Sequence, residues 1–143
     1  MTLYSLILTA HIVTALILII SVAYADHLGL LWIRGKVETL NAKKMLSLHH
    51  RMYVGLVIML ITGTYLFLPA REYLLSTPVF YIKMIFVGTL WVNSIFIGKL
   101  LHLSTTKPYA LLHTKERVPL YVTGAISIAS WAGSIIAATQ LGL

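Results

Sequence analysis

Four long apolar stretches, separated by short polar segments, dominate the pattern of the chain. They cover residues 2–25, 49–68, 78–101 and 118–143. A helix needs about 20 predominantly apolar residues to cross the hydrocarbon core of a bilayer, and each stretch has about that length. The pattern therefore predicts an all-α integral membrane protein, with a single membrane domain over residues 1–143 built as a four-transmembrane-helix bundle.

The composition supports a membrane protein and narrows its chemistry. The 143 residues are 59% hydrophobic and only 10% charged, whereas a soluble domain carries about 25% charged residues. The chain has no cysteine. Disulfides, thiolate zinc sites, iron–sulfur clusters and thiol catalysis are therefore excluded.

The net charge of +7 is concentrated between particular apolar stretches. Nine of the eleven basic residues follow the first span or surround the connection from the third span to the fourth: Arg34, Lys36, Lys43, Lys44, Arg51, Lys99, Lys107, Lys115 and Arg117. Basic residues favour the cytoplasmic side of a membrane. We expect loops 26–48 and 102–117 in the cytoplasm, both termini outside, and a bacterial inner membrane as the location. Topology explains the positive charge without a nucleic-acid partner.

Two loops are expected to differ in length. A short outer loop should lie near residues 69–78, which begin and end with proline. The longer loop 26–48 contains a helical spacing of apolar residues over 37–48, with Lys43 and Lys44 on the other positions. This segment is interpreted as a surface helix or as an extension of the second span.

The first candidate site is His11 with Lys83, both expected in the outer half of the membrane. His11 lies about 13 Å along the first span, too deep for a short side chain to reach bulk water. Ionisable residues inside a membrane are costly and usually functional. Lys83 lies near the start of the third span, where extension of its side chain towards the surface is the simpler alternative.

A second candidate site gathers histidines at the opposite ends of the spans: His27, His49, His50 and His102. Two imidazoles from different helices at one depth can provide the axial ligands of a b-type haem. His49 shares a helix face with Met52, Leu56 and Gly63. His50 shares one with Val54, Val57, Ile61 and Leu68, a face that looks like lipid contact or general packing. Headgroup solvation is the alternative for each histidine alone.

A methionine pattern overlaps the second site. Met45, His49, Met52 and Met59 share one helix face. Thioether and imidazole groups suit Cu(I), and a His/Met pair also serves as a haem ligand set. With His11, residues His49 and Met52 are the candidate metal ligands. Ordinary packing by methionine is the favoured alternative to copper.

Polar residues on the last two spans suggest an interior cavity. Glu116, Thr123, Ser127 and Ser134 form a stripe that faces a cavity or a cofactor, or else bonds to carbonyls of its own helix. Asn93, near mid-membrane, is expected to form an interhelical hydrogen bond. Because no hydrolytic triad, phosphate loop or zinc motif is present, proton or electron transfer suits the residues better. Lys83 and Glu116 are the candidate catalytic residues.

Three stretches together resemble a superfamily of small bacterial membrane proteins. They are LTAHIVTALILI around His11, TPVFYIKMIFVGTLWVNSIF around Lys83 and KERVPLYVTGAIS around Glu116. The superfamily includes the copper-resistance protein D membrane domain and the four-helix oxidase that converts protoporphyrinogen to protoporphyrin. The oxidase resemblance implies bound haem b, with His11 and Lys83 as the transferable positions. The arginine-rich loops and tryptophan-rich span starts of that branch are absent, and LHHRMYVGLVIMLITGTYL looks like the second span of b-type cytochromes.

These observations predict a haem b-binding membrane redox protein that passes electrons to or from a lipophilic substrate, a quinone or a porphyrinogen. His11 and one of His49 or His50 are the preferred ligands, followed by His102. An oxidoreductase activity would fit this reading. The alternatives are a membrane protein that transports or handles copper or another metal ion, and a structural or assembly subunit of a membrane complex. A homo-oligomer or a membrane-complex partner is compatible with each.

Overall fold

Four long helices form almost the whole molecule. The structure is a computed structural model that describes residues 2–142. Its elements are α1 (Leu3–Ile33), α2 (Ala42–Ser76), α3 (Pro78–Thr106), the 3-10 turn η1 (Tyr109–Leu111) and α4 (Thr114–Gln140). All four α-helices are long and apolar enough to cross a membrane. The predicted four-helix, all-α class is confirmed; the end predicted for the fourth span, residue 143, lies outside the described residues.

The first connection is shorter than the predicted loop 26–48, which was wrong in its bounds. Helix α1 continues to Ile33 and ends where Gly35 adopts a φ of +68°. Glycine takes this left-handed conformation without a Cβ penalty, so it commonly terminates helices. Helix α2 begins after Asn41, whose side chain accepts a hydrogen bond from the Lys44 amide at 3.0 Å. Only the second part of the predicted helical segment 37–48 is therefore helical, as an extension of α2.

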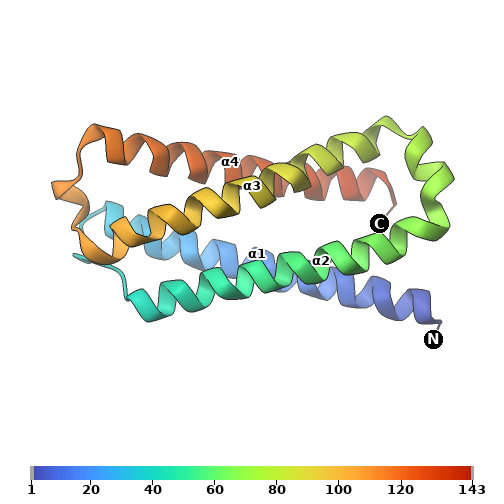
Figure 1. Ribbon diagram of the computed structural model, residues 1–143, viewed down its shortest axis with the longest axis horizontal. Coiled ribbons are helices and arrows are strands. Elements are labelled where there is room, and N and C mark those ends of the chain that lie inside the picture. The colour runs from blue at the N-terminus through green and yellow to red at the C-terminus, as the bar shows by residue number, and fades with distance from the viewer. Residues whose placement is uncertain (1, 143) are drawn as a thin grey trace.

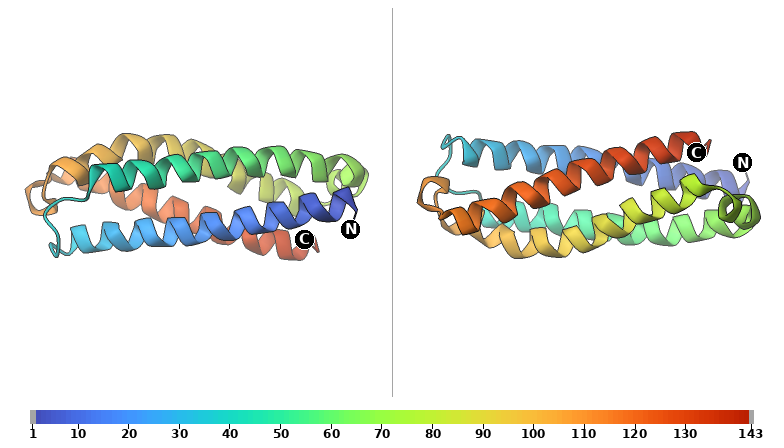
Figure 2. Two further views of the ribbon diagram at one scale, coloured as in Figure 1. Left: turned by 90° about the horizontal axis from the view of Figure 1, so that it is seen from below. Right: turned by 90° about the horizontal axis from the view of Figure 1, so that it is seen from above.

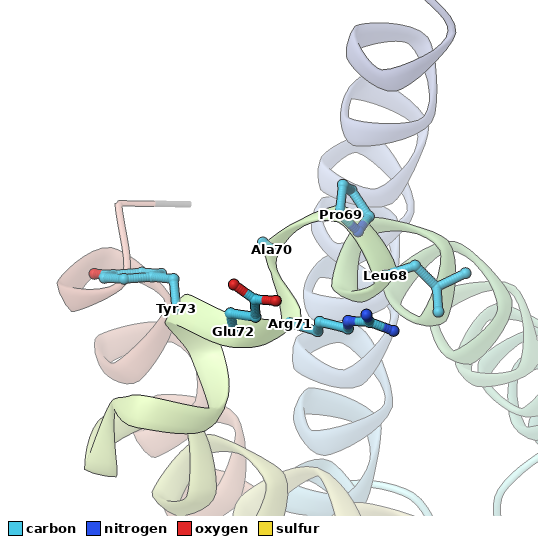
Figure 3. Close-up of a pocket in the computed structure, with 6 residues that line it drawn as sticks. All are labelled: Leu68, Pro69, Ala70, Arg71, Glu72 and Tyr73. Carbon is cyan, nitrogen blue, oxygen red and sulfur yellow. The ribbon is translucent and has the colours of Figure 1, made fainter.

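The predicted outer loop 69–78 is also mostly helix. Helix α2 runs through Pro69 to Ser76, and only Thr77 separates it from α3, which opens with Pro78. Proline lacks an amide donor and clashes with the preceding turn, which bends a helix without necessarily ending it. Figure 3 shows this bend, where residues 68–73 line a surface hollow. Because six consecutive residues form the whole wall, the hollow belongs to the bend and not to the bundle interior.

The helices are arranged as two antiparallel hairpins, α1–α2 and α3–α4, which meet mainly through α2 and α3. Figures 1 and 2 show both termini and the α2–α3 turn at one end of the bundle, here called the terminal end. The connections 34–41 and 107–113 lie at the other, here called the loop end. The predicted placement of both termini on one side is thus matched by the chain path.

Small residues allow close contact inside each hairpin. A Cβ at Gly55 would overlap the Leu18 side chain, which is buried, and a Cβ at Gly133 would overlap the Phe86 ring. Between the hairpins, the Tyr53 and Trp91 rings meet edge to face with centroids 5.5 Å apart. Membrane helices rely on such close packing because lipid provides no hydrophobic force between them.

An apolar cluster closes the loop end. Its buried members are Trp32, Leu40, Met45, Leu48 and Leu112. The Trp32 indole nitrogen donates to the Lys107 carbonyl at 2.9 Å, and the Leu40 amide donates to the Ser104 carbonyl at 2.8 Å. These bonds tie both connections to the helix ends. Met45 is therefore a packing residue of this cluster.

Candidate functional site

The His11 side chain is held between α1 and α2. Its Nδ1 lies 2.7 Å from the Thr62 hydroxyl, and the ring is partly buried. Gly63 faces the ring, and a Cβ there would lie 3.4 Å from His11 Cε1, in ordinary van der Waals contact. The α1–α2 packing therefore gives this imidazole one defined orientation.

The hydrogen bonds around Thr62 favour one tautomer of His11. The Thr62 hydroxyl is 2.8 Å from the Ile58 carbonyl, the usual internal bond of a helical threonine. With its single proton donated there, the Thr62 oxygen accepts from Nδ1–H of His11. The other nitrogen, Nε2, then carries a free lone pair. Metal-ligating histidines have this arrangement, because the bond from the second nitrogen fixes the ring.

Lys83 of α3 belongs to the same site. The register between α2 and α3 is set by His49 beside Gly98 and by Phe67 stacked on Phe80 at 5.5 Å. That register puts Lys83 level with Gly63 and thus with His11. The lysine is half-buried at this level. The structure therefore places at one level of the bundle the two residues that the sequence placed in one site.

The four histidines expected near the loop end do not form a cluster. Only His49 turns inward; His27, His50 and His102 are exposed. The His50 face is exposed along its length, including Val54 and Ile61, whereas Leu56 on the His49 face is buried. The question left open between the adjacent histidines is therefore answered in favour of His49.

His49 packs against bare backbone of α3. A Cβ at Gly98 would lie 2.9 Å from its Nε2. The ring also borders a central cavity of about 40 Å³ that receives side chains from all four helices. The lining residues are Leu18, Val22, His49, Met52, Tyr53, Leu56, Leu90, Asn93, Ser94, Ile97, Ser127 and Trp131.

Distance separates the two candidate histidines. His11 lies opposite Thr62, which is thirteen residues beyond His49 on α2. At a rise of 1.5 Å per residue this is about 20 Å, so one metal ion cannot bind both side chains. An imidazole with one nitrogen bonded to Thr62 could serve as a haem ligand, whereas the exposed His27, His50 and His102 form no bis-histidine pair with His49. Within residues 2–142, no group of three His, Asp or Glu side chains could hold a metal ion.

Some polar residues of the α4 stripe face the cavity, and others bond to carbonyls of their own helix. Ser127 is buried and lines the cavity, whereas the Thr123 hydroxyl bonds to the Pro119 carbonyl of its own helix at 2.8 Å. Asn93 confirms its predicted interhelical bond: its Nδ2 donates to the Thr123 carbonyl at 3.0 Å.

Glu116 has a structural role at the loop end. One carboxylate oxygen accepts from the His113 amide at 3.0 Å and completes the cap of α4. The other forms an ion pair with Lys107 at 3.0 Å. The α3–α4 register set by Asn93 with Thr123 and by Phe86 with Gly133 leaves Glu116 far from Lys83. The two candidate catalytic residues therefore do not share a site.

Sequence reasoning missed Thr62 and Gly63 as the partners of His11. One signal in the sequence could have pointed to Gly63: it shares a helix face with His49 and Leu56, and this face continues to the level of His11. Comparison of the chain with family models, with curated proteins and with solved structures finds no match.

Proposed function

We propose that the protein is a haem b-binding membrane redox protein that passes electrons to or from a lipophilic substrate, a quinone or a porphyrinogen. The observation that carries the proposal is the hydrogen bond between His11 Nδ1 and the Thr62 hydroxyl, which leaves Nε2 as the nitrogen for a ligand. A neutral imidazole fixed in this way is a prepared axial ligand.

In this proposal the side chains of the protein hold and orient the cofactor, and haem b supplies one-electron chemistry when it is bound. His11 Nε2 is the ligand, and Thr62 keeps the ring from rotating. Lys83 lies at the level of His11, where its ammonium group would pair with a propionate carboxylate or donate a proton. At this depth the lipid around the bundle would admit substrates that dissolve in the bilayer.

The membrane orientation is part of the proposal. The loop end carries most of the basic residues, among them Arg34, Lys36, Lys107 and Lys115. By the positive-inside rule this end faces the cytoplasm of a bacterial inner membrane, and both termini face outward. The His11–Lys83 site then lies in the outer half of the bilayer.

A visible spectrum of protein purified from haem-replete cells tests the function. We expect a Soret band and, after reduction, the α band of b haem. His11→Ala should remove both bands, whereas His113→Ala, a substitution in the exposed loop, should leave them unchanged. A colourless preparation, or equal haem content in the two variants, would overturn the proposal.

A second candidate, copper handling, is favoured by one observation: His49 and Met52 line the same cavity. Imidazole and thioether donors together suit Cu(I). Metal analysis separates the candidates, because copper without haem, lost in Met52→Leu and retained in Met59→Leu, would favour this second function. If no cofactor of either kind is found but a partner co-purifies stably, the chain is a structural or assembly subunit.

A further inference from the structure

One outer face of α2 changes from basic to apolar along its length. Near the loop end it carries four exposed side chains, here called the basic face: Lys43, Lys44, Ser47 and Arg51. Side chains three or four residues apart lie on the same side of a helix. The same side therefore continues with an exposed apolar row formed by Val54, Ile58 and Ile61. Charge at one end and hydrocarbon along the rest is also the layout of a phospholipid.

The depth of the basic face fits the headgroup layer of a bilayer. Arg51 and Arg71 are twenty residues apart on α2, and no charged residue lies between them. At 1.5 Å per residue this stretch rises about 30 Å, which is the thickness of the hydrocarbon core. Arg51 then lies at one boundary of the core, and Lys43 and Lys44 begin about two turns further out.

Helix α1 provides a second wall for the basic face. The Lys44 Nζ lies 4.9 Å from the centroid of the Tyr24 ring, which is exposed. Leu18 over Gly55 sets the register of the two helices, and this register puts Tyr24 between Lys44 and Arg51 in depth. The cation–π contact therefore turns the Lys44 ammonium group towards the level of Arg51, so that two positive charges approach one headgroup position.

No acidic side chain neutralises these charges. Helix α2 has no Asp or Glu before Glu72, and within residues 2–142 the one ion pair joins Lys107 to Glu116. Phosphate oxygens accept charge-assisted hydrogen bonds from lysine and arginine, and at this depth the membrane itself supplies phosphates. The positive-inside rule accounts for basic residues at this end, but not for their alignment with Tyr24 and with the apolar row.

We propose that the basic face and Tyr24 bind the headgroup of an anionic phospholipid, whose acyl chains lie along the apolar row. The ammonium and guanidinium groups donate to the phosphate oxygens, and the chains add apolar contacts that a free anion lacks. This lipid site goes beyond the redox function. It involves neither His11 nor a cofactor, and it is the same whichever side of the membrane the loop end faces.

Native mass spectrometry of the detergent-solubilised protein tests the site. The protein is titrated with phosphatidylglycerol or with phosphatidylcholine of the same acyl chains, and the first phosphatidylglycerol should bind about tenfold more tightly. Each basic residue near a membrane contributes about 1 kcal/mol towards anionic lipid, or about fivefold in affinity. Lys44→Gln and Arg51→Gln should each weaken phosphatidylglycerol binding by that factor and leave phosphatidylcholine binding unchanged. Equal binding of the two lipids by the unmodified protein would overturn the proposal.

Lys99 of α3 provides a matched control. It is exposed, and the contact of His49 with Gly98 puts it at the depth of the basic face. No other lysine or arginine lies within two turns of it on α3. Lys99→Gln should therefore leave the affinity for phosphatidylglycerol unchanged. If it weakens binding as much as Arg51→Gln does, the lipid responds only to the total charge and the proposed site is wrong.

Thermal unfolding in detergent separates a lipid from a free phosphate. A ligand that binds the native state stabilises it, so phosphatidylglycerol should raise the unfolding temperature of the unmodified protein and of Lys99→Gln, and much less that of the double variant Lys44→Gln/Arg51→Gln. Glycerol phosphate at the same concentration, which has no acyl chains, should have no effect. Equal stabilisation by glycerol phosphate would overturn the assignment to a lipid. The haem content of the double variant should be unchanged, so this test and the test of haem binding can fail separately.

Discussion

The bond between His11 and Thr62 allows a sharp test, because α2 contains a matched control two residues away. Thr62→Val replaces the hydroxyl with a methyl group of nearly the same shape and leaves the His11 Nδ1–H without a partner. Thr64 is an exposed threonine of the same helix, and its hydroxyl bonds to the Leu60 carbonyl at 2.8 Å. Thr64→Val therefore removes a hydroxyl without touching His11.

The magnitudes follow from the type of bond. Interhelical hydrogen bonds in membrane proteins contribute about 0.6 kcal/mol on average and up to about 1.7 kcal/mol. We expect Thr62→Val to lower the free energy of unfolding in mixed micelles by an amount in that range. Loss of a partner that orients a metal-bound histidine weakens metal affinity by about 10–100-fold, and haem affinity should fall by a similar factor. Thr62→Ser should restore most of both losses, because it restores the hydroxyl.

Haem titration of the apoprotein and ¹⁵N NMR of the histidines measure these effects. In the unmodified protein the His11 signals should be those of a neutral ring protonated at Nδ1, and Thr62→Val should produce a mixture of tautomers. Two results would refute the reasoning: a His11 ring protonated at Nε2 in the unmodified protein, or equal haem affinities for Thr62→Val and Thr64→Val.

Three further predictions concern packing and the loop end. Gly55→Ala should destabilise the bundle by about 1–3 kcal/mol, because the new Cβ meets the buried Leu18 side chain and overpacks it. The control Gly88→Ala places its Cβ in open space and should be neutral or stabilising by up to about 1 kcal/mol. Equal changes of the two variants in thermal unfolding in detergent would contradict this prediction. Trp32→Phe removes the indole donor to Lys107 and should lower the unfolding free energy by about 1–3 kcal/mol, seen as earlier proteolysis of the connections; unchanged proteolysis would count against this bond. Glu116→Gln should fray the start of α4 in hydrogen exchange and leave haem content unaltered, and a loss of haem would restore Glu116 as a functional candidate.

The helices were predictable from the sequence because their signal is long and uniform. Twenty apolar residues can hardly form anything but a spanning helix. The ends were less predictable, since residues 70–76 are polar enough to look like a loop. They remain helical because Pro69 bends α2 without ending it, and because Pro78 can begin α3 after a single residue.

The candidate site was predictable only in part. The depth of His11 and Lys83 could be counted along the spans, so their common level was foreseen. Helix phase put His50 on an apolar face with Val54 and Ile61, but the choice between His49 and His50 stayed open until the structure showed that this face is exposed. The partner Thr62 could not be foreseen, because it depends on how α1 rotates against α2, and that rotation is set by Leu18 over Gly55.

The division into two hairpins has a consequence for access to the interior. Each hairpin makes most of its contacts within itself. The two are joined by Thr77, by a seam of ring contacts between α2 and α3, and at the loop end by the apolar cluster with the Trp32–Lys107 and Leu40–Ser104 bonds. Tyr53 with Trp91 and Phe67 with Phe80 are single layers of that seam. A small separation of the two hairpins between these connections would therefore create a lateral opening towards the lipid without unfolding either hairpin. A molecule dissolved in the bilayer could enter through it without first crossing into water.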